Sequence, residues 1–180
     1  MFAVIIFGSN LEPEFYIPKG LKALNEQVKI LSISPVYENP AIGKTASPFY
    51  LNGACLVETN FPPLGLHQYV LRPIEDALGR VRGENANGMC TIDLDLVLYE
   101  QEVLSAANLE LPAPDILRYA FVALLVALLV PDWTHPKTKQ TMAEIGERFL
   151  PEKLTFYHRE DVNLAIETEL FTRKANAYND

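Results

Sequence analysis

The segment Thr91–Tyr99 reads TIDLDLVLY and alternates polar with apolar residues around two aspartates. A period of two over such a length predicts a β-strand with one face turned toward a core. Residues two apart on a strand project from the same face, so Asp93 and Asp95 are expected side by side. Leu94 and Leu96 then face the core. The fold must therefore contain a sheet that carries two adjacent carboxylates on one face.

Three other segments have strand character. Ala3–Phe7 is a short run of β-favouring residues, and Leu51–Thr59 alternates along its length. Val28–Tyr37 alternates as well, with a break in phase at Leu31 and an expected end near Pro35. With the aspartate segment, these runs predict four strands.

Helical spacing of apolar residues predicts the helices. They are expected at Lys19–Gln27, Leu64–Leu78, Ile116–Val130 and Thr141–Phe149. Pro18 precedes the first in a position that favours a helix start, whereas Pro73 inside the second should kink it or move its start to about Arg72. From about Pro151 the chain is polar and shows no clear pattern.

The order of these elements predicts an α+β fold. Over the first hundred residues the elements follow the order of a ferredoxin-like β-α-β-β-α-β core. Such a core has a mainly antiparallel sheet with packed helices. Residues 39–49 and 79–88 are expected as loops, and a loop as long as the first is usually functional or mobile.

Composition limits the function classes. The chain has 180 residues, of which 49% are hydrophobic and 21% charged, so one packed domain is expected. A formal net charge of −8 disfavours nucleic acid as a general partner, because an acidic surface repels a phosphate backbone. A local cluster of arginines could still bind a small polyphosphate.

Neither cysteine usage nor hydropathy points to an extracellular or membrane protein. Cys55 and Cys90 are too few for a disulfide scaffold and lack the spacing of a zinc site. The apolar run within Tyr119–Trp133 is shorter than the roughly 20 residues that span a bilayer, so a buried helix is expected. The N-terminal apolar stretch lacks the flanks of a signal peptide. We expect a cytoplasmic protein without a membrane partner.

The aspartate pair is the strongest candidate for chemistry. Two unpaired carboxylates at this distance repel each other, which raises one pKa unless a cation lies between them. Magnesium suits the pair, because it prefers oxygen ligands and keeps waters and substrate phosphates in its shell. The alternative from spacing alone is a solvent-facing polar edge of the sheet.

Other polar groups give weaker signals. Arg80 and Arg82 follow the second main helix and suit bidentate phosphate contacts, although basic residues also favour a helix C-terminus. Three histidines, His67, His135 and His158, lie far apart in the sequence and are expected as surface or capping residues rather than metal ligands.

Five blocks in order resemble one enzyme family. These blocks span about Phe2 to Pro131, in the order and at the intervals seen in the 6-hydroxymethyl-7,8-dihydropterin pyrophosphokinases. They are FGSN, SPVYENPAIG, FYLNGACLVET, IEDALGRVR and TIDLDLVLY. The resemblance implies a folate-pathway kinase that transfers pyrophosphate from ATP to the hydroxymethyl group of a reduced pterin. It also implies residues 1–150 as the family domain and 151–180 as an extension.

The resemblance assigns roles by position. Asp93 and Asp95 resemble the aspartates that hold two magnesium ions, and they act in catalysis together with Arg80 and Arg82. Glu75 and Arg118 are implied at the ATP site. The implied pterin contacts are Asn39, Pro40, Ala41, Ile42, Tyr50, Asn52 and Phe121.

Several positions depart from the family pattern. Where the family has Trp-Gly-Pro-Arg before the aspartate strand, this chain has Asn87, Gly88, Met89 and Cys90. Ala113-Pro114 replaces a His-Tyr pair, and Tyr119 stands where the family has an arginine, with Arg118 adjacent. Losing such cations removes charge that stabilises a transferring phosphate. Two alternatives to an active pyrophosphokinase follow: a weakened paralogue that binds pterin or nucleotide in a regulatory or partner role, and a related transferase acting on a modified pterin.

Overall fold

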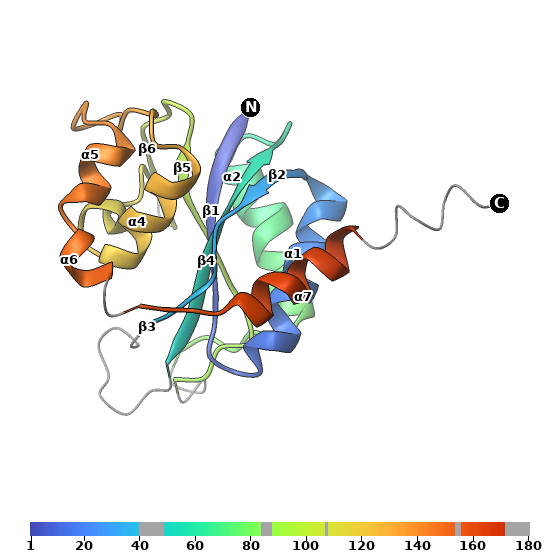
Figure 1. The fold of residues 1–180 in the computed structure, drawn as a ribbon. Helices are drawn as coiled ribbons and strands as arrows, with labels where there is room; N and C mark the ends of the chain where they lie inside the picture. The colour runs from blue at the N-terminus through green and yellow to red at the C-terminus, as the bar shows by residue number, and fades with distance from the viewer. Residues whose placement is uncertain (40–48, 84–87, 107, 154–155, 172–180) are drawn as a thin grey trace.

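A computed structural model describes residues 1–39, 49–83, 88–106, 108–153 and 156–171. Its main sheet has the order β5-β1-β4-β3-β8, and β2 also pairs with β4 (Figure 1). The strands are β1 (Phe2–Ser9), β2 (Lys29–Ile33), β3 (Tyr37–Asn39), β4 (Tyr50–Glu58), β5 (Asp93–Tyr99) and β8 (Tyr157–His158). Every pairing in it is antiparallel.

Helices cover both faces of this sheet (Figure 1). One face carries α1 (Pro13–Gln27), α2 (Pro63–Gly65), the π-helical turn η1 (Leu66–Leu71), α3 (Arg72–Ala77) and α7 (Glu160–Phe171). The other carries the 3₁₀ turn η3 (Pro114–Leu117), α4 (Ala120–Leu129), α5 (Met142–Glu147) and α6 (Leu150–Lys153). A hairpin of β6 (Leu104–Ala106) and β7 (Leu109–Leu111) follows β5.

The central strand β1 belongs to both cores. Ile5 and Phe7 are buried in the cluster under α1, whereas Val4 and Ile6 are buried in the cluster under α4. A strand covered on both faces is apolar along its length rather than alternating, which explains the continuous run at the N-terminus. The β-α-β-β-α-β core and the mainly antiparallel sheet confirm the predicted fold class.

Local departures from the predicted elements have physical causes. Helix α1 begins at Pro13 rather than Lys19, because Pro13 and not Pro18 takes the first helical position; Pro18 lies inside the helix and is buried. The predicted helix at 116–130 begins only at Ala120, after the 3₁₀ turn that opens at Pro114.

Two irregularities follow the sequence closely. The break in phase at Leu31 corresponds to a register shift between β2 and β4, between Ile30 and Ser32. The predicted kink at Pro73 takes the form of the π-helical turn, which ends one residue before Arg72. A residue without an N–H cannot continue an α-helical ladder, and such π-turns are frequent at functional sites.

The C-terminal part of the chain is built into the fold. Strand β8 pairs with β3, and α7 lies along α1 (Figure 1). Val162 and Ile166 are fully buried in the same cluster as α1. Within the described ranges, no helix is both long and apolar enough to cross a membrane.

Replacing Ile166 with alanine should therefore destabilise the whole domain. The side chain is 1% exposed, and loss of such a core residue costs about 2–4 kcal/mol in free energy of unfolding. Leu164→Ala on the same helix is the matched control, because Leu164 is 64% exposed and should cost less than about 0.5 kcal/mol. Urea titration measures both, and equal effects would contradict the packing of α7.

Candidate active site

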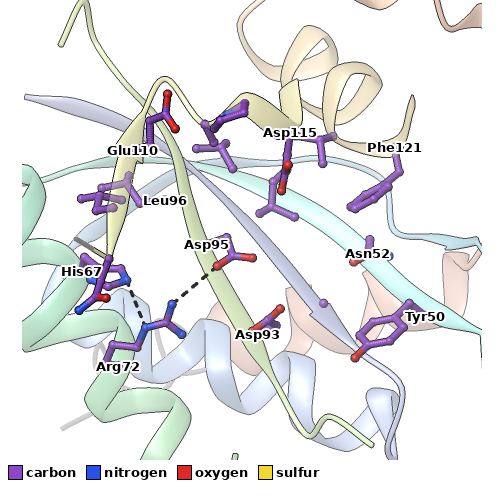
Figure 2. A pocket seen from close by; sticks show the side chains of 18 of the residues that line it. Tyr50, Asn52, His67, Arg72, Asp93, Asp95, Leu96, Glu110, Asp115 and Phe121 are labelled. Carbon is purple, nitrogen blue, oxygen red and sulfur yellow. Dashed lines mark hydrogen bonds and ion pairs between the residues drawn. The ribbon is translucent and has the colours of Figure 1, made fainter. Parts of the chain in front are cut away.

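A cleft of about 410 cubic ångströms opens beside β5, between η1 and the start of α4 (Figure 2). Asp93 and Asp95 project into it from β5, and Arg72 enters from the helical side. Tyr50 and Phe121 lie at its opposite end. The cleft therefore joins an acidic centre to an end that carries aromatic side chains.

The two aspartates share one face of β5, as the alternation predicts. Leu94 between them is fully buried on the opposite face, while the side chains of Asp93 and Asp95 keep 34% and 54% of their surfaces exposed. Asp93 Oδ1 lies 3.4 Å from Arg80 Nη2, and Asp95 Oδ1 lies 3.9 Å from Arg72 Nη2. Neither pairing is tight, so both carboxylates remain available to a further cation.

The pKa of Asp95 is raised to about 7. Although its side chain is open to the cleft, loss of contact with bulk water is the largest cause, and the neighbouring Asp93 carboxylate adds to it. Arg72 acts in the opposite direction. A carboxylate whose ionised form is disfavoured in this way gains from a divalent cation.

The donor set fits magnesium. Among the described residues, no group of three or more histidine, cysteine, aspartate or glutamate side chains gathers around one point. Two carboxylates alone leave most of an octahedral shell to waters and phosphate oxygens, which is how magnesium is usually held with nucleotides.

Glu75 organises the cations around the aspartates. Its carboxylate is fully buried; Oε1 accepts a 2.8 Å hydrogen bond from the backbone N–H of Leu94, and Oε2 pairs with Arg72 at 2.6 Å and closely with Arg82. The residue is not among those that line the cleft. It ties α3 to the outer edge of β5 and fixes two guanidinium groups.

Arg72 and His67 were missed by the sequence reasoning. His67 Nε2 accepts a 3.2 Å hydrogen bond from Arg72 Nε, which requires that this nitrogen be unprotonated. Burial and the two nearby arginines lower the pKa of His67, so the ring is neutral at pH 7. The histidine is buried rather than a surface residue.

The π-helical turn explains why spacing alone hid this pair. Residues five apart are not neighbours on an α-helix, but the i→i+5 geometry of η1 brings His67 beside Arg72. The signal that could have been found is the ordinary i,i+3 pairing of Arg72 with Glu75.

A second, more open hollow of about 700 cubic ångströms adjoins the cleft. Arg72 and Asp93 line both spaces, and Arg80 and Arg82 line the hollow. The predicted catalytic arginines therefore lie together beside the aspartates. Arg82 also pairs with Asp76 at 2.7 Å, which fixes its guanidinium at the rim.

The aromatic end contains four of the predicted pterin contacts. They are Asn39, Tyr50, Asn52 and Phe121. Asn52 Nδ2 donates a 2.7 Å hydrogen bond to Asn39 Oδ1, which joins β4 to β3 at the cleft. A Cβ at Gly8 would collide with Asn52 Oδ1, so a larger residue there would displace the Asn52 side chain. Pro40, Ala41 and Ile42 lie outside the described residues.

A scan against family models matches residues 4–131 to 7,8-dihydro-6-hydroxymethylpterin-pyrophosphokinase, HPPK. The chain belongs to this family. The HPPK domain accounts for the resemblance carried by the five sequence blocks, and the function expected from them, pyrophosphate transfer in folate synthesis, is the one that the family carries. The family generally uses magnesium and ATP together with a pterin.

Curated relatives agree with this assignment. A 2-amino-4-hydroxy-6-hydroxymethyldihydropteridine pyrophosphokinase of Pseudomonas aeruginosa is 33% identical over 135 residues, which cover 73% of this chain and 82% of that one. The folic acid synthesis protein fol1 of Schizosaccharomyces pombe is 30% identical over 185 residues. That match covers 99% of this chain and only 25% of the yeast protein.

Solved structures support the fold. A Plasmodium falciparum HPPK-DHPS superimposes with a TM-score of 0.67 at 12% sequence identity, over 89% of this chain and 44% of that one. The present chain thus spans less than half of this larger protein. Similarity at this level of identity concerns architecture, and it agrees with the observed sheet and its two helical layers.

The positions that depart from the HPPK pattern lie in different surroundings. Cys90 is 1% exposed and does not line the cleft, and its backbone N–H donates a 2.6 Å hydrogen bond to Asn10 Oδ1. Ala113 lines the cleft. Arg118 is exposed and is not among the lining residues. Asn87 lies outside the described residues.

Asp95→Asn should stabilise the metal-free protein at neutral pH. A carboxyl group whose pKa rises from 3.8 to about 7 on folding destabilises the fold once it is ionised. This destabilisation is absent well below pH 3.8, grows as the pH rises toward 7 and is constant above pH 7. Because the Asp95 side chain is 54% exposed, solvent screening reduces this penalty, and we expect a gain of about 1 kcal/mol at pH 8 and none well below pH 3.8.

Denaturant unfolding in EDTA at several pH values tests this. Asp93→Asn is the comparison, because it removes the repulsion on Asp95 but also loses the 3.4 Å pairing with Arg80, so its gain should be smaller than that of Asp95→Asn. A gain for Asp95→Asn that does not change with pH would contradict the electrostatic explanation.

Proposed function

We propose that this chain transfers pyrophosphate from ATP to a 6-hydroxymethyl-7,8-dihydropterin, with the reaction centred on Asp93 and Asp95. The observation that carries the proposal is that two spaces meet at Asp93, beside Asp95: one has an aromatic end, and the other is lined by arginines. A flat heterocycle and a polyphosphate could then meet at the metal-binding carboxylates.

The aromatic end suits a pterin. A planar ring fits between apolar and aromatic side chains, while a few polar groups contact its edge. Phe121 and Tyr50 provide aromatic surface, and Asn52 provides an amide oriented by its bond to Asn39. The hydroxymethyl group would then point toward Asp95.

The arginine side suits the nucleotide. Two magnesium ions between the aspartates and the phosphates would neutralise charge and align the transferring group. Arg80 and Arg82 remain candidates for phosphate contacts, and Glu75 acts through the arginines that it holds rather than on ATP directly. Phosphoryl-type transfer needs little beyond positioning and such charge stabilisation.

Arg72 could replace part of the cationic charge lost at Cys90 and Tyr119. Its guanidinium is held by Glu75 and His67, which leaves Nη2 directed toward Asp95 and the cleft (Figure 2). A planar, permanently charged group fixed in this way needs no reorganisation when negative charge moves during transfer.

The first test is AMP formation from ATP, 6-hydroxymethyl-7,8-dihydropterin and magnesium. We expect turnover by the wild-type chain and its loss in Asp95→Ala, because a single remaining carboxylate holds the ions poorly. Glu102→Ala is the control, because Glu102 is exposed beyond the opposite end of β5 and does not line the cleft. Wild-type protein that binds the pterin without releasing AMP would favour the weakened paralogue instead.

The second test concerns Arg72. Arg72→Ala should lower kcat by about 10²-fold, since removal of one preorganised charge at a transition state has effects of this size. Arg72→Lys should recover only part of the rate, because lysine cannot hold Glu75 and His67 while facing the cleft. Arg148→Ala, an exposed arginine outside the cleft, is the control. Full activity in Arg72→Ala would exclude the compensating role.

A further inference from the structure

The C-terminal segment, residues 156–171, lies beyond the part of the chain that the HPPK family model matches. It nevertheless contacts the strand that delivers Asn39 to the cleft. Strand β3 has three residues, with β4 on one side and β8 on the other. Tyr37 pairs with His158, and Glu38 pairs with Tyr157.

Asn163 fixes the backbone just before β3. Its Oδ1 accepts a 2.8 Å hydrogen bond from the N–H of Val36, and its Nδ2 donates to the carbonyl of Ser34 at 3.1 Å. The N–H of Arg159 donates to the Val36 carbonyl at 2.9 Å. Residues 34–36 are the irregular connection between β2 and β3, so these bonds supply the backbone partners that a sheet would otherwise provide.

Arg159 adds a charged link between three elements. Its guanidinium contacts Glu14 of α1 at 2.6 Å, Glu38 of β3 at 3.4 Å and Asp161 of α7 at 2.8 Å. The arginine side chain is only 19% exposed, so these contacts are less screened than ordinary surface pairs. The residue next to Glu38 is Asn39.

The segment itself is firmly anchored. Val162 and Ile166 are buried in the core with α1, and Lys22 of α1 pairs with Glu169 at 2.5 Å. Arg159 and Asn163 therefore extend from a fixed helix rather than from a loose end. These contacts fix the position of β3. They therefore also fix Asn39 Oδ1, which accepts a hydrogen bond from Asn52 Nδ2.

We propose that the C-terminal segment is a positioning element for the substrate cleft. Arg159 and Asn163 hold β3 so that Asn39 keeps the Asn52 amide oriented toward the planar heterocycle. Both residues act through Asn39 and Asn52 and touch no substrate. This inference rests on the proposed function, and it assigns the C-terminal segment an effect on pterin recognition but none on ATP.

Steady-state kinetics of Arg159→Ala and Asn163→Ala test the proposal. We expect KM for the pterin to rise about fivefold to tenfold, as for one lost hydrogen bond, while KM for ATP changes by less than about twofold. Glu167→Ala, an exposed charge on α7, is the matched control and should change neither. Asn163→Asp keeps the acceptor for Val36 but loses the donor to Ser34, so an intermediate rise is expected.

A second readout does not depend on catalysis. The side-chain amide resonances of Asn52 in a ¹⁵N spectrum should shift in Arg159→Ala and Asn163→Asp but remain unchanged in Glu167→Ala. Wild-type protein that forms no AMP and binds no pterin would refute the proposed function. The resonance shifts would still show whether Arg159 and Asn163 control the position of the Asn52 amide. The inference is overturned if the Asn52 resonances stay in place, or if both KM values rise together.

Discussion

The buried carboxylate of Glu75 is the interaction on which the site depends. It accepts the N–H of Leu94, the backbone group between the two aspartates, and it holds Arg72 and Arg82 on its other oxygen. A buried charge without partners would be costly, so the folded state favours the arrangement in which all of these contacts form together. The edge of β5, the helix α3 and two guanidinium groups are thereby fixed by one side chain.

Much of the fold could be predicted because its signals are local and periodic. Alternation around Asp93 and Asp95 placed both carboxylates on one face, and the break in phase at Leu31 marked a real register shift. The packing of α7 could not be predicted in the same way, because residues 160–171 include many polar side chains. Only two of them, Val162 and Ile166, are buried in the core cluster. Partners 120 or more residues away, such as Val36 and Glu38, decide its position.

The site was predictable only where a residue's role depends on its own strand or helix. Asn52 and Phe121, which the family resemblance implies as pterin contacts, both line the cleft, and Arg80 lies beside Asp93. Arg118 is adjacent in sequence to the arginine position at Tyr119, yet it is exposed outside the cleft. Arg72 is remote from both altered positions in sequence but reaches Asp95, because a π-turn and a buried glutamate orient it.

The charge of the cleft also bears on how a nucleotide could enter it. Four carboxylates line the described cleft, from Asp93, Asp95, Glu110 and Asp115, against the single arginine Arg72. The neutral His67 adds nothing to the positive side. Free ATP would therefore meet net negative charge at the aspartates, and the arginines of the adjoining hollow are partly neutralised by Glu75 and Asp76. Divalent cations bound with the nucleotide would reverse this balance, so the same aspartates that disfavour the phosphates alone would favour their metal complex.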